Sequence, residues 1–504
     1  MLKNFSLSKV FEKIFSRYPV KTRRFLEILP GAVSWSLILF PIWGSFLAPL
    51  AVAYFVIFYN VFWFYKSFSL AIIAFWAQRK IKDAQKENWL KKAKKFADFE
   101  KVNHLIILPN YKERVEKLRT TLEYLVRQSF PKEKMAIVLA MEAREKEAVR
   151  KAKILGKEFG KKFGHFFITL HPEIPGEVAG KSSNEAWAGI WAKKKLIDEL
   201  GLNLDFVTVS SVDADSLFHP QYFAYLSYEF LKAGEKRHLY FWQSANVLHN
   251  NIWRVPAPIR VLSTISSVWR MGVLVRHDRL VPNSTYSLSL KMLDQIGYWD
   301  RDVIPEDYRI FFKAFYKLGG KVEVKPIFLT TSMDAAESTT YWKSLLNKYH
   351  QEKRWAWGVS DDPLFIKWWL TVPGVSFWAK TIHLLKIVED HFLWPVNWFI
   401  ITFGANIVSL LNPDFTRTAI GYNLSRFSSL VLSLCLLALA AILVVDLRQR
   451  PKPSSHLGWR RIFLLVEFIL MPVVSFFLSA LPGLVAHTKL MIGKRLEYKV
   501  TEKV

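Results

Sequence analysis

Residues 206–215 read FVTVSSVDAD, an alternating run rich in β-branched residues that ends in two aspartates one residue apart. This pattern predicts a strand that carries charge to its C-terminal end, where open α/β sheets bind their ligands. In a strand, Asp213 and Asp215 would point the same way, and such a pair of carboxylates suits Mg²⁺ or Mn²⁺ holding a diphosphate. A solvated turn after a buried strand is the alternative interpretation of D-x-D taken alone.

The residues around this stretch alternate between strand-like and helical patterns. Strands are predicted at 104–111, 135–142 and 165–171, and helices at 115–129, 143–162 and 180–200. A further helix is predicted to begin after Pro305 and to stop at Gly319 and Gly320. Such alternation is typical of an α/β domain with a mainly parallel sheet and helices on both faces.

The hydrophobic residues make up 51% of the chain and cluster before position 80 and after position 392. This distribution predicts a membrane protein with a soluble insert. The uncharged run 29–65 predicts two short membrane helices with a turn near Pro49, and three more apolar segments lie near 393–411, 427–446 and 462–484.

The formal net charge is +27, and the Lys and Arg residues crowd beside the hydrophobic segments. Contact with anionic membrane lipids explains this placement better than nucleic acid does. The one cysteine, Cys435, excludes a disulfide framework and a cysteine-based metal site. A polar stretch precedes the first apolar run, so no cleavable signal peptide is expected.

Seven segments follow from these patterns. They are an amphipathic segment (1–28), a transmembrane hairpin (29–66), an interfacial or linker helix (67–100), a catalytic domain (101–360), interfacial helices (361–392), transmembrane helices (393–492) and a tail (493–504). Basic residues on both sides of the hairpin place the catalytic domain in the cytoplasm. The number of C-terminal spans stays open, because either 372–390 also spans or 462–492 enters the membrane and returns.

Short motifs occur in a fixed order along the middle of the chain. They comprise Pro109, Tyr111 and Glu113 after the first strand, Glu142 after the second, G-K-x-x-N with Lys181 and Asn184, D-x-D with Asp213 and Asp215, Pro305-Glu306-Asp307, and Gln351-x-x-Arg354-Trp355. This order resembles the inverting glycosyltransferases of family 2, which have the GT-A fold. Within that family the membrane-integrated branch, which includes cellulose and hyaluronan synthases, is the most similar.

The resemblance implies a role for each motif. Asp307 would be the catalytic base, Asp215 would bind the metal, and Asp213 would bind the donor's ribose or the same ion. The donor would be bound by Pro109, Tyr111, Glu113, Glu142, Lys181, Asn184 and Asp213, and its diphosphate and the acceptor by Gln351, Arg354 and Trp355. The tail residues Tyr498, Val500, Thr501 and Lys503 resemble the gating loop of cellulose synthases.

Several positions depart from the family pattern or have ordinary structural explanations. Glu142 stands where relatives have V-D-D-G-S, Pro305 replaces a Thr, and the acceptor segment reads PNSTYS at 282–287. Acidic residues in a first helical turn often only complement the helix dipole. A Trp at helical spacing is often a core residue, although Arg354 on the same face makes a dry core less favourable.

The resemblance, together with the apolar segments, implies a metal-dependent inverting hexosyltransferase at the cytoplasmic membrane face. Its expected donor is a nucleotide sugar, with UDP as the carrier, and its acceptor is a growing polysaccharide. The first alternative is an enzyme that adds a single sugar to polyprenyl phosphate or another membrane lipid. The second is a non-catalytic membrane protein whose GT-A domain only binds a nucleotide.

Overall fold

The computed structural model describes residues 7–452 and 466–496, and the chain within it falls into two compact units. The sheet unit comprises Trp76–Ile252 and Val273–Ala335, and the helical unit comprises Met1–Phe75, Trp253–Gly272 and Ala336–Thr501. The tail residues of the predicted gating loop, Tyr498, Val500, Thr501 and Lys503, lie outside the described residues.

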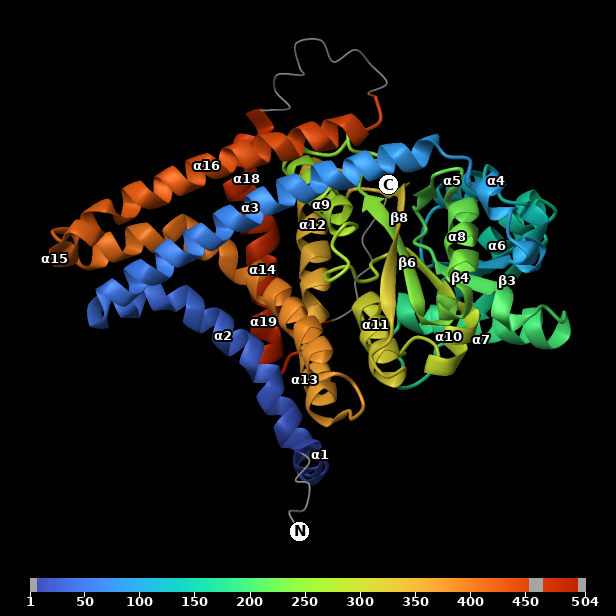
Figure 1. Cartoon of the computed structure of the whole chain (residues 1–504), viewed down its shortest axis with the longest axis horizontal. Coiled ribbons are helices and arrows are strands. Elements are labelled where there is room, and N and C mark those ends of the chain that lie inside the picture. Colours follow the sequence, from blue (N-terminus) through green and yellow to red (C-terminus); the bar gives the residue numbers. More distant parts are fainter. Residues whose placement is uncertain (1–6, 453–465, 497–504) are drawn as a thin grey trace. The chain divides into compact units, whose positions relative to one another are not determined.

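The described part of the sheet unit contains one eight-stranded sheet with the order β3-β2-β1-β4-β7-β6-β8-β5 (Figure 1). Its strands are β1 (Asn103–Asn110), β2 (Met135–Glu142), β3 (His165–His171), β4 (Val207–Ser211), β5 (Leu217–Phe218), β6 (Tyr240–Val247), β7 (Tyr286–Ser289) and β8 (Glu323–Ser332). Neighbours among β3, β2, β1 and β4 are parallel, whereas β7 runs antiparallel to both β4 and β6. β8 is parallel to β6 and antiparallel to β5. The sheet is therefore more mixed than the alternation pattern predicts.

The first three strands lie within one residue of their predicted positions. β2 is buried along its whole length, which explains its continuous apolar sequence. The helices of this unit are α4 (Trp89–Ala93), α5 (Val115–Val126), α6 (Ala148–Phe159), α7 (Lys181–Lys193), α8 (Tyr222–Lys232), α10 (Leu290–Ile296) and α11 (Glu306–Lys317). α11 starts and stops as predicted, with Pro305 before its first residue and positive φ angles at Gly319 and Gly320 after its end.

The helical unit is built from long apolar helices. They are α1 (Leu7–Arg17), α2 (Pro19–Leu47), α3 (Pro49–Lys86, which continues into the sheet unit), α9 (Ala257–Val273), α12 (Tyr341–Ala356), α13 (Asp362–Thr371), α14 (Phe377–Leu411), α15 (Pro413–Thr416), α16 (Ala419–Gln449), α18 (Met471–Ser475) and α19 (Leu481–Met491). Short 3₁₀ or π segments are η1 (Ala97–Lys101), η2 (Lys132–Lys134), η3 (Lys194–Glu199), η4 (Leu204–Phe206), η5 (Gly234–Leu239), η6 (Trp357–Asp361), η7 (Glu467–Leu470) and η8 (Phe476–Ala480).

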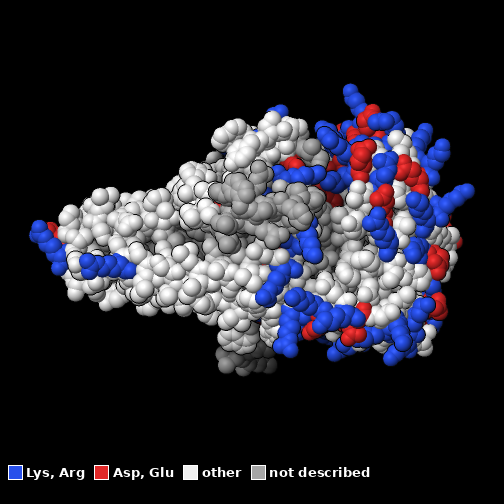
Figure 2. Space-filling model, turned by 90° about the horizontal axis from the view of Figure 1, so that it is seen from above, with Lys and Arg blue, Asp and Glu red and all other residues white. Residues whose placement is uncertain are grey.

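Within the described ranges, five helical stretches are long and apolar enough to cross a membrane. They are Pro19–Leu47, Pro49–Lys86, Phe377–Leu411, Ala419–Gln449 and Glu467–Met491. The break between the first two falls at Ala48, next to the turn expected at Pro49. Figure 2 shows charged side chains gathered over the sheet unit and a largely uncharged surface along the long helices.

Several of these helices extend beyond their predicted limits, α3 and α14 among them. α3 continues to Lys86, and α14 runs without a break from Phe377 to Leu411, across the boundary expected at position 392. One charge in the segment 361–392, which was expected to be interfacial, is paired, because Glu389 of α14 lies 2.6 Å from Lys66 of α3. A paired charge is far less costly at a membrane than an isolated one.

The helix α9 joins the helical unit although it lies between two strands of the sheet in sequence. Val261 packs in a buried cluster with Leu443 of α16 and Phe468 of η7. Arg260 forms two hydrogen bonds with the carboxylate of Glu467, at 2.8 and 3.1 Å. The chain therefore leaves the sheet unit after β6 and returns to it for β7.

Candidate active site

The two aspartates of the D-x-D motif lie in a turn and not in a strand. β4 ends at Ser211, and the turn is closed by a 3.0 Å hydrogen bond from the Ser216 amide to the Asp213 carbonyl. The expectation that both side chains point the same way because of strand geometry was therefore wrong. Each carboxylate instead has its own partners.

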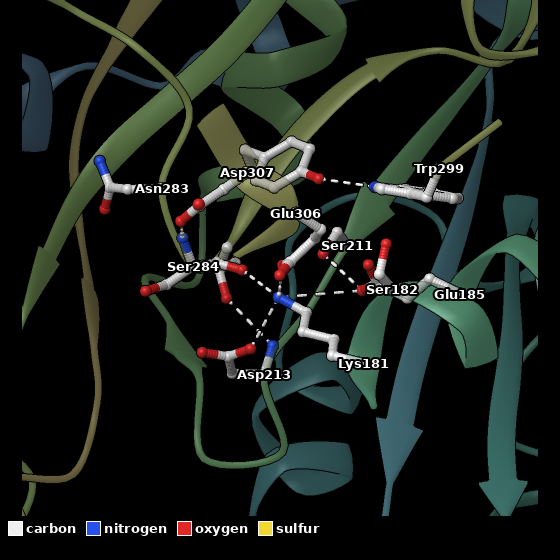
Figure 3. Close-up of polar contacts among 12 residues, drawn as sticks. Lys181, Ser182, Glu185, Ser211, Asp213, Asn283, Ser284, Trp299, Glu306 and Asp307 are labelled. Atoms are coloured by element: carbon white, nitrogen blue, oxygen red, sulfur yellow. Dashed lines mark hydrogen bonds and ion pairs between the residues drawn. The ribbon is translucent and has the colours of Figure 1, made fainter. Parts of the chain in front are cut away.

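Lys181, the first residue of α7, lies at the centre of a group of acidic side chains (Figure 3). Its Nζ is 2.8 Å from Asp213 Oδ1, 2.9 Å from Glu306 Oε1 and 3.8 Å from Glu185 Oε1. It also donates to the carbonyl of Ser284 at 2.5 Å. Burial opposes the charge of Lys181, but the carboxylates outweigh burial and raise its pKa well above the ordinary value. This lysine therefore stays charged and joins the D-x-D turn to the first turn of α11.

Asp307 is held in the first turn of α11 by two backbone amides. Its Oδ2 accepts from the amide of Ser284 and its Oδ1 from the amide of Tyr308, each at 3.0 Å. The next residue after Ser284, Thr285, accepts a hydrogen bond from the Asp213 amide at 3.1 Å. Asp307 and Asp213 are thus linked through two consecutive residues of the segment before β7.

The electrostatics of this group are set by many carboxylates around one lysine. Burial raises the pKa of Asp307, and the charge of Asp213 adds to that effect, whereas Lys181 and the two backbone amides lower it. Burial likewise raises the pKa of Glu306. An acid with a raised pKa binds a proton more readily, so Asp307 is a stronger base than an exposed aspartate.

Asp215 faces the end of β8. Its Oδ2 accepts a hydrogen bond from the backbone amide of Asp334 at 3.0 Å. Asn250 bridges the two residues, because its side-chain amide donates to the Asp215 carbonyl at 3.0 Å and to Asp334 Oδ1 at 2.9 Å. Lys117 of α5 lies 2.5 Å from the other oxygen of Asp334. Asp334 thereby fixes the orientation of Asp215.

The D-x-D residues fit a metal ion only as part of a mixed set of ligands. In residues 7–452 and 466–496, no three His, Cys, Asp or Glu side chains are grouped so that they could hold a metal ion. Magnesium, however, commonly binds one or two carboxylates and completes its shell with waters and substrate phosphates. Asp215 and Asp213 suit that kind of site and not one made of protein ligands alone.

The predicted donor-binding residues after β1 and β2 lie near one another. Tyr111 follows β1, and the guanidinium carbon of Arg144 is 3.9 Å from the centre of its ring. Arg144 also lies 3.3 Å from Glu142, the last residue of β2. Pro109 lies opposite Ala140 in the β1–β2 pair. Glu113 contributes its backbone carbonyl to Lys151.

Asn184 is placed differently from the other residues of G-K-x-x-N. Its side-chain amide donates to the carbonyl of Ala140 in β2 at 2.9 Å, and its side-chain oxygen is buried without a hydrogen-bond partner. The contact with Ala140 ties α7 to the sheet and does not reach the carboxylates around Lys181. It remains a prediction as a donor-binding residue.

Gln351, Arg354 and Trp355 lie near the end of α12 in the helical unit. Lys348, which is 1% exposed at its side chain, lies 2.6 Å from Glu352 and 3.1 Å from Gln351 Oε1. Its Nζ is 4.6 Å from the centre of the Trp355 ring. The buried lysine thus organises the helix face that carries the motif.

Sequence reasoning missed Asp334 and Lys348, and it named Thr285 only as part of the acceptor segment 282–287, without a role of its own. Asp334 had a recognisable signal, since it is an acidic residue two positions after the end of a strand. Lys348 also had one, because it lies three, four and seven residues before Gln351, Glu352 and Trp355, the spacing of one helix face. Thr285 had none, because its contact depends on how the segment before β7 folds.

Comparisons with known proteins give one family match and likenesses to solved structures. The described residues form a mixed sheet with acidic residues near strand ends, and apolar helices precede and follow it in the sequence. Residues 208–445 match the model of glycosyl transferase family group 2. No curated protein matches the chain.

Two solved structures illustrate the likeness of the fold. The mannosyltransferase PcManGT from Pyrobaculum calidifontis, in complex with GDP-Man and Mn²⁺, is 12% identical with a TM-score of 0.43 and covers 87% of this chain and 100% of its own. S. aureus TarS 1-349 in complex with UDP is 10% identical with a TM-score of 0.37 and covers 67% of this chain and 91% of its own. Likeness at this level assigns neither a donor nor an acceptor.

Proposed function

We propose that the chain is a membrane-bound, inverting glycosyltransferase that moves a sugar from a nucleotide-sugar donor to a glycan acceptor at the cytoplasmic face. The observation that carries the proposal is the position of Asp307. This buried carboxylate is held by two backbone amides and linked through Ser284 and Thr285 to Asp213 of the D-x-D turn. A base and a diphosphate-binding pair belong that close together in a sugar transferase.

Asp307 would act as the general base. It takes the proton of the acceptor hydroxyl while the hydroxyl oxygen attacks C1 of the donor sugar, and the nucleoside diphosphate leaves from the opposite side. One displacement inverts the configuration at C1. The raised pKa of Asp307 supports this role, and Lys181 keeps the base ionised between turnovers.

Asp215, together with Asp213, would hold Mg²⁺ or Mn²⁺ against the donor diphosphate. Such an ion neutralises the negative charge that develops on the departing nucleoside diphosphate. Asp334 and Asn250 keep Asp215 in place. Lys181 limits the repulsion between Asp213 and the acidic residues of α11.

The membrane-spanning helices support an acceptor that is handled at the membrane. Basic residues on both sides of the uncharged run 29–65, including Arg23, Arg24, Lys66 and Arg79, favour a cytoplasmic sheet unit. A nucleotide sugar is available in that compartment. The helices therefore support synthesis of a polysaccharide or glycosylation of a membrane lipid in preference to a soluble acceptor.

The test is a donor screen with purified full-length protein in detergent or nanodiscs. Radiolabelled UDP-, GDP- and dTDP-sugars are incubated with membrane lipid extract, with Mg²⁺, with Mn²⁺ or with a chelator. We expect transfer from one donor class, loss of transfer in the chelator, and a 10²- to 10⁴-fold lower rate for Asp307→Asn. Asp302→Asn is the matched control, because Asp302 precedes the same helix and its side chain is 71% exposed.

The product separates the two acceptor classes. Label that migrates as polymer supports polysaccharide synthesis, and label that partitions into organic solvent supports addition to a lipid. Nucleotide binding with no transfer from any donor, unchanged by Asp307→Asn, would refute the proposed activity.

A further inference from the structure

The loop after β1 contains a residue with an unfavourable backbone conformation. Lys112, between the predicted donor-binding residues Tyr111 and Glu113, has a φ of 66°. Residues with a Cβ rarely adopt this left-handed backbone conformation, because the Cβ crowds the following carbonyl oxygen. Such a conformation persists only when surrounding contacts enforce it.

Glu145, in the turn after β2, supplies the first of these contacts. Its Oε2 accepts the backbone amide of Lys112 at 2.8 Å and the side-chain amide of Asn110 at 3.3 Å. The Glu145 side chain is 5% exposed. One buried carboxylate therefore holds both the strained residue and the last residue of β1.

Lys151, on the first turn of α6, supplies the second contact. Its Nζ forms a buried ion pair with Glu145 and also donates to the backbone carbonyl of Glu113. The side chain of Lys151 is 9% exposed. The Glu145–Lys151 pair thus holds the loop at Asn110, Lys112 and Glu113.

A third contact is made to the side chain of Tyr111 in this loop. Arg144, next to Glu145, lies over the ring of Tyr111 at 3.9 Å and pairs with Glu142 at 3.3 Å. The guanidinium limits the positions of the Tyr111 ring. Arg144 and Glu145 of the turn after β2, together with Lys151 of α6, therefore fix the loop backbone, the Tyr111 ring and the carboxylate that ends β2.

We propose that the Glu145–Lys151 pair is a positioning device that fixes the Tyr111–Glu113 loop for binding of the nucleotide part of the donor. The inference rests on the proposed function. Replacing a buried ion pair by apolar residues is often neutral for stability, so stability alone gives little reason for this pair. The pair's contacts to three points of a strained loop explain it better, because a preformed loop reduces the ordering cost of binding.

The test compares four variants of the full-length protein. In Glu145→Gln and Lys151→Met we expect the KM for the donor to rise at least tenfold while kcat changes less than threefold, since binding and not chemistry loses support. The matched controls are the single variants Glu147→Gln and Arg150→Met. They change an ion pair in the same segment whose side chains are 53% and 67% exposed. The control variants are expected to keep the wild-type KM.

Rescue distinguishes positioning from a general loss of stability. Glycine adopts a positive φ freely, so Lys112→Gly removes the need to enforce the conformation. Combined with Glu145→Gln, it is expected to recover at least a third of the lost donor affinity. A lower thermal midpoint in Glu145→Gln with an unchanged KM, or an equal fall of kcat and kcat/KM, would overturn the proposal.

A second readout is independent of catalysis. Trypsin cleaves after Lys112 and Arg114, and we expect faster cleavage there in Glu145→Gln than in wild type or in Glu147→Gln. Thermal shifts with UDP and GDP should shrink in the same variants. If wild type binds nucleotide without transferring sugar, the proposed activity fails while the cleavage and shift data still decide the loop's role. Equal cleavage rates and equal thermal shifts in all variants would overturn the positioning role of the Glu145–Lys151 pair.

Discussion

Ser284 donates its backbone amide to Oδ2 of Asp307 at 3.0 Å, and it does so from a left-handed conformation with a φ of 51°. For a residue with a Cβ this conformation costs about 1–2 kcal/mol. The same residue accepts a hydrogen bond from Lys181 through its carbonyl. The strain therefore lies where two charged residues of the candidate site are held in place.

Substitutions of Ser284 should separate strain from function. Ser284→Gly keeps the amide and the carbonyl and relieves the strain, so we expect a turnover within about twofold of wild type and an equal or higher thermal midpoint. Ser284→Val places a β-branched residue at a positive φ and should lower both. The measurements are steady-state rates and thermal unfolding in detergent. Identical behaviour of the two variants would contradict this role.

The pH dependence of the reaction should report on Asp307. The base must be ionised, so kcat/KM rises with pH as Asp307 loses its proton, with a midpoint above the ordinary 3.8 because burial raises its pKa. Lys181 favours the ionised form, so Lys181→Met should move the acid limb to higher pH. Lys193, at the other end of α7, pairs with the exposed Asp198. The control variant Lys193→Met should therefore leave the acid limb in place. A shift to lower pH in Lys181→Met would show that the sign is wrong.

The dependence on divalent ions should respond to Asp334. Asp334→Ala removes the contacts to Lys117 and Asn250 that hold the backbone beside Asp215. Residues that orient a ligand typically change metal affinity by about 10–100-fold, and we expect a loss of this size in the Mn²⁺ concentration for half-maximal rate. Glu323→Gln, at the exposed start of β8, serves as control. An unchanged Mn²⁺ titration in Asp334→Ala would contradict a role for the Asp334 side chain in orienting Asp215.

Lys348 should matter for the stability of the helical unit. Lys348→Met leaves the buried Glu352 without its partner, and breaking a buried ion pair from one side costs about 3–5 kcal/mol. The double variant Lys348→Met with Glu352→Gln should recover much of the thermal midpoint. Lys343→Met, on the exposed first turn of α12, should have no effect. Equal midpoints for Lys348→Met and Lys343→Met would argue against the predicted role of this pair.

The parts of the fold that could be predicted are those with local periodic signals. β1, β2 and β3 are apolar runs bounded by turns, and α11 has a proline before it and glycines after it. β7 has only the residues YSLS. It pairs with β4 and β6 after the chain has passed through α9, which lies between β6 and β7 in the sequence. No local pattern encodes that return of the chain.

The candidate site shows the same division. The order of motifs predicts Asp213, Lys181 and Asp307 as site residues, and the structure links the three through Ser284 and Thr285. The turn that carries D-x-D was mistaken for strand because VSSVDAD continues the alternation beyond Ser211. Contacts through backbone amides, such as that of Asp334 with Asp215, leave no trace in residue type and could not be predicted.

The detour of the chain through α9 has a practical consequence. Residues 253–272 belong to the helical unit, and β7 and β8 of the sheet follow them in the sequence. A contiguous fragment with all eight strands therefore also includes α9 without the helices it packs against. Its Val261, normally packed on Leu443 and Phe468, would face water. Trimming away the membrane helices should yield an insoluble enzyme core unless α9 is redesigned as well.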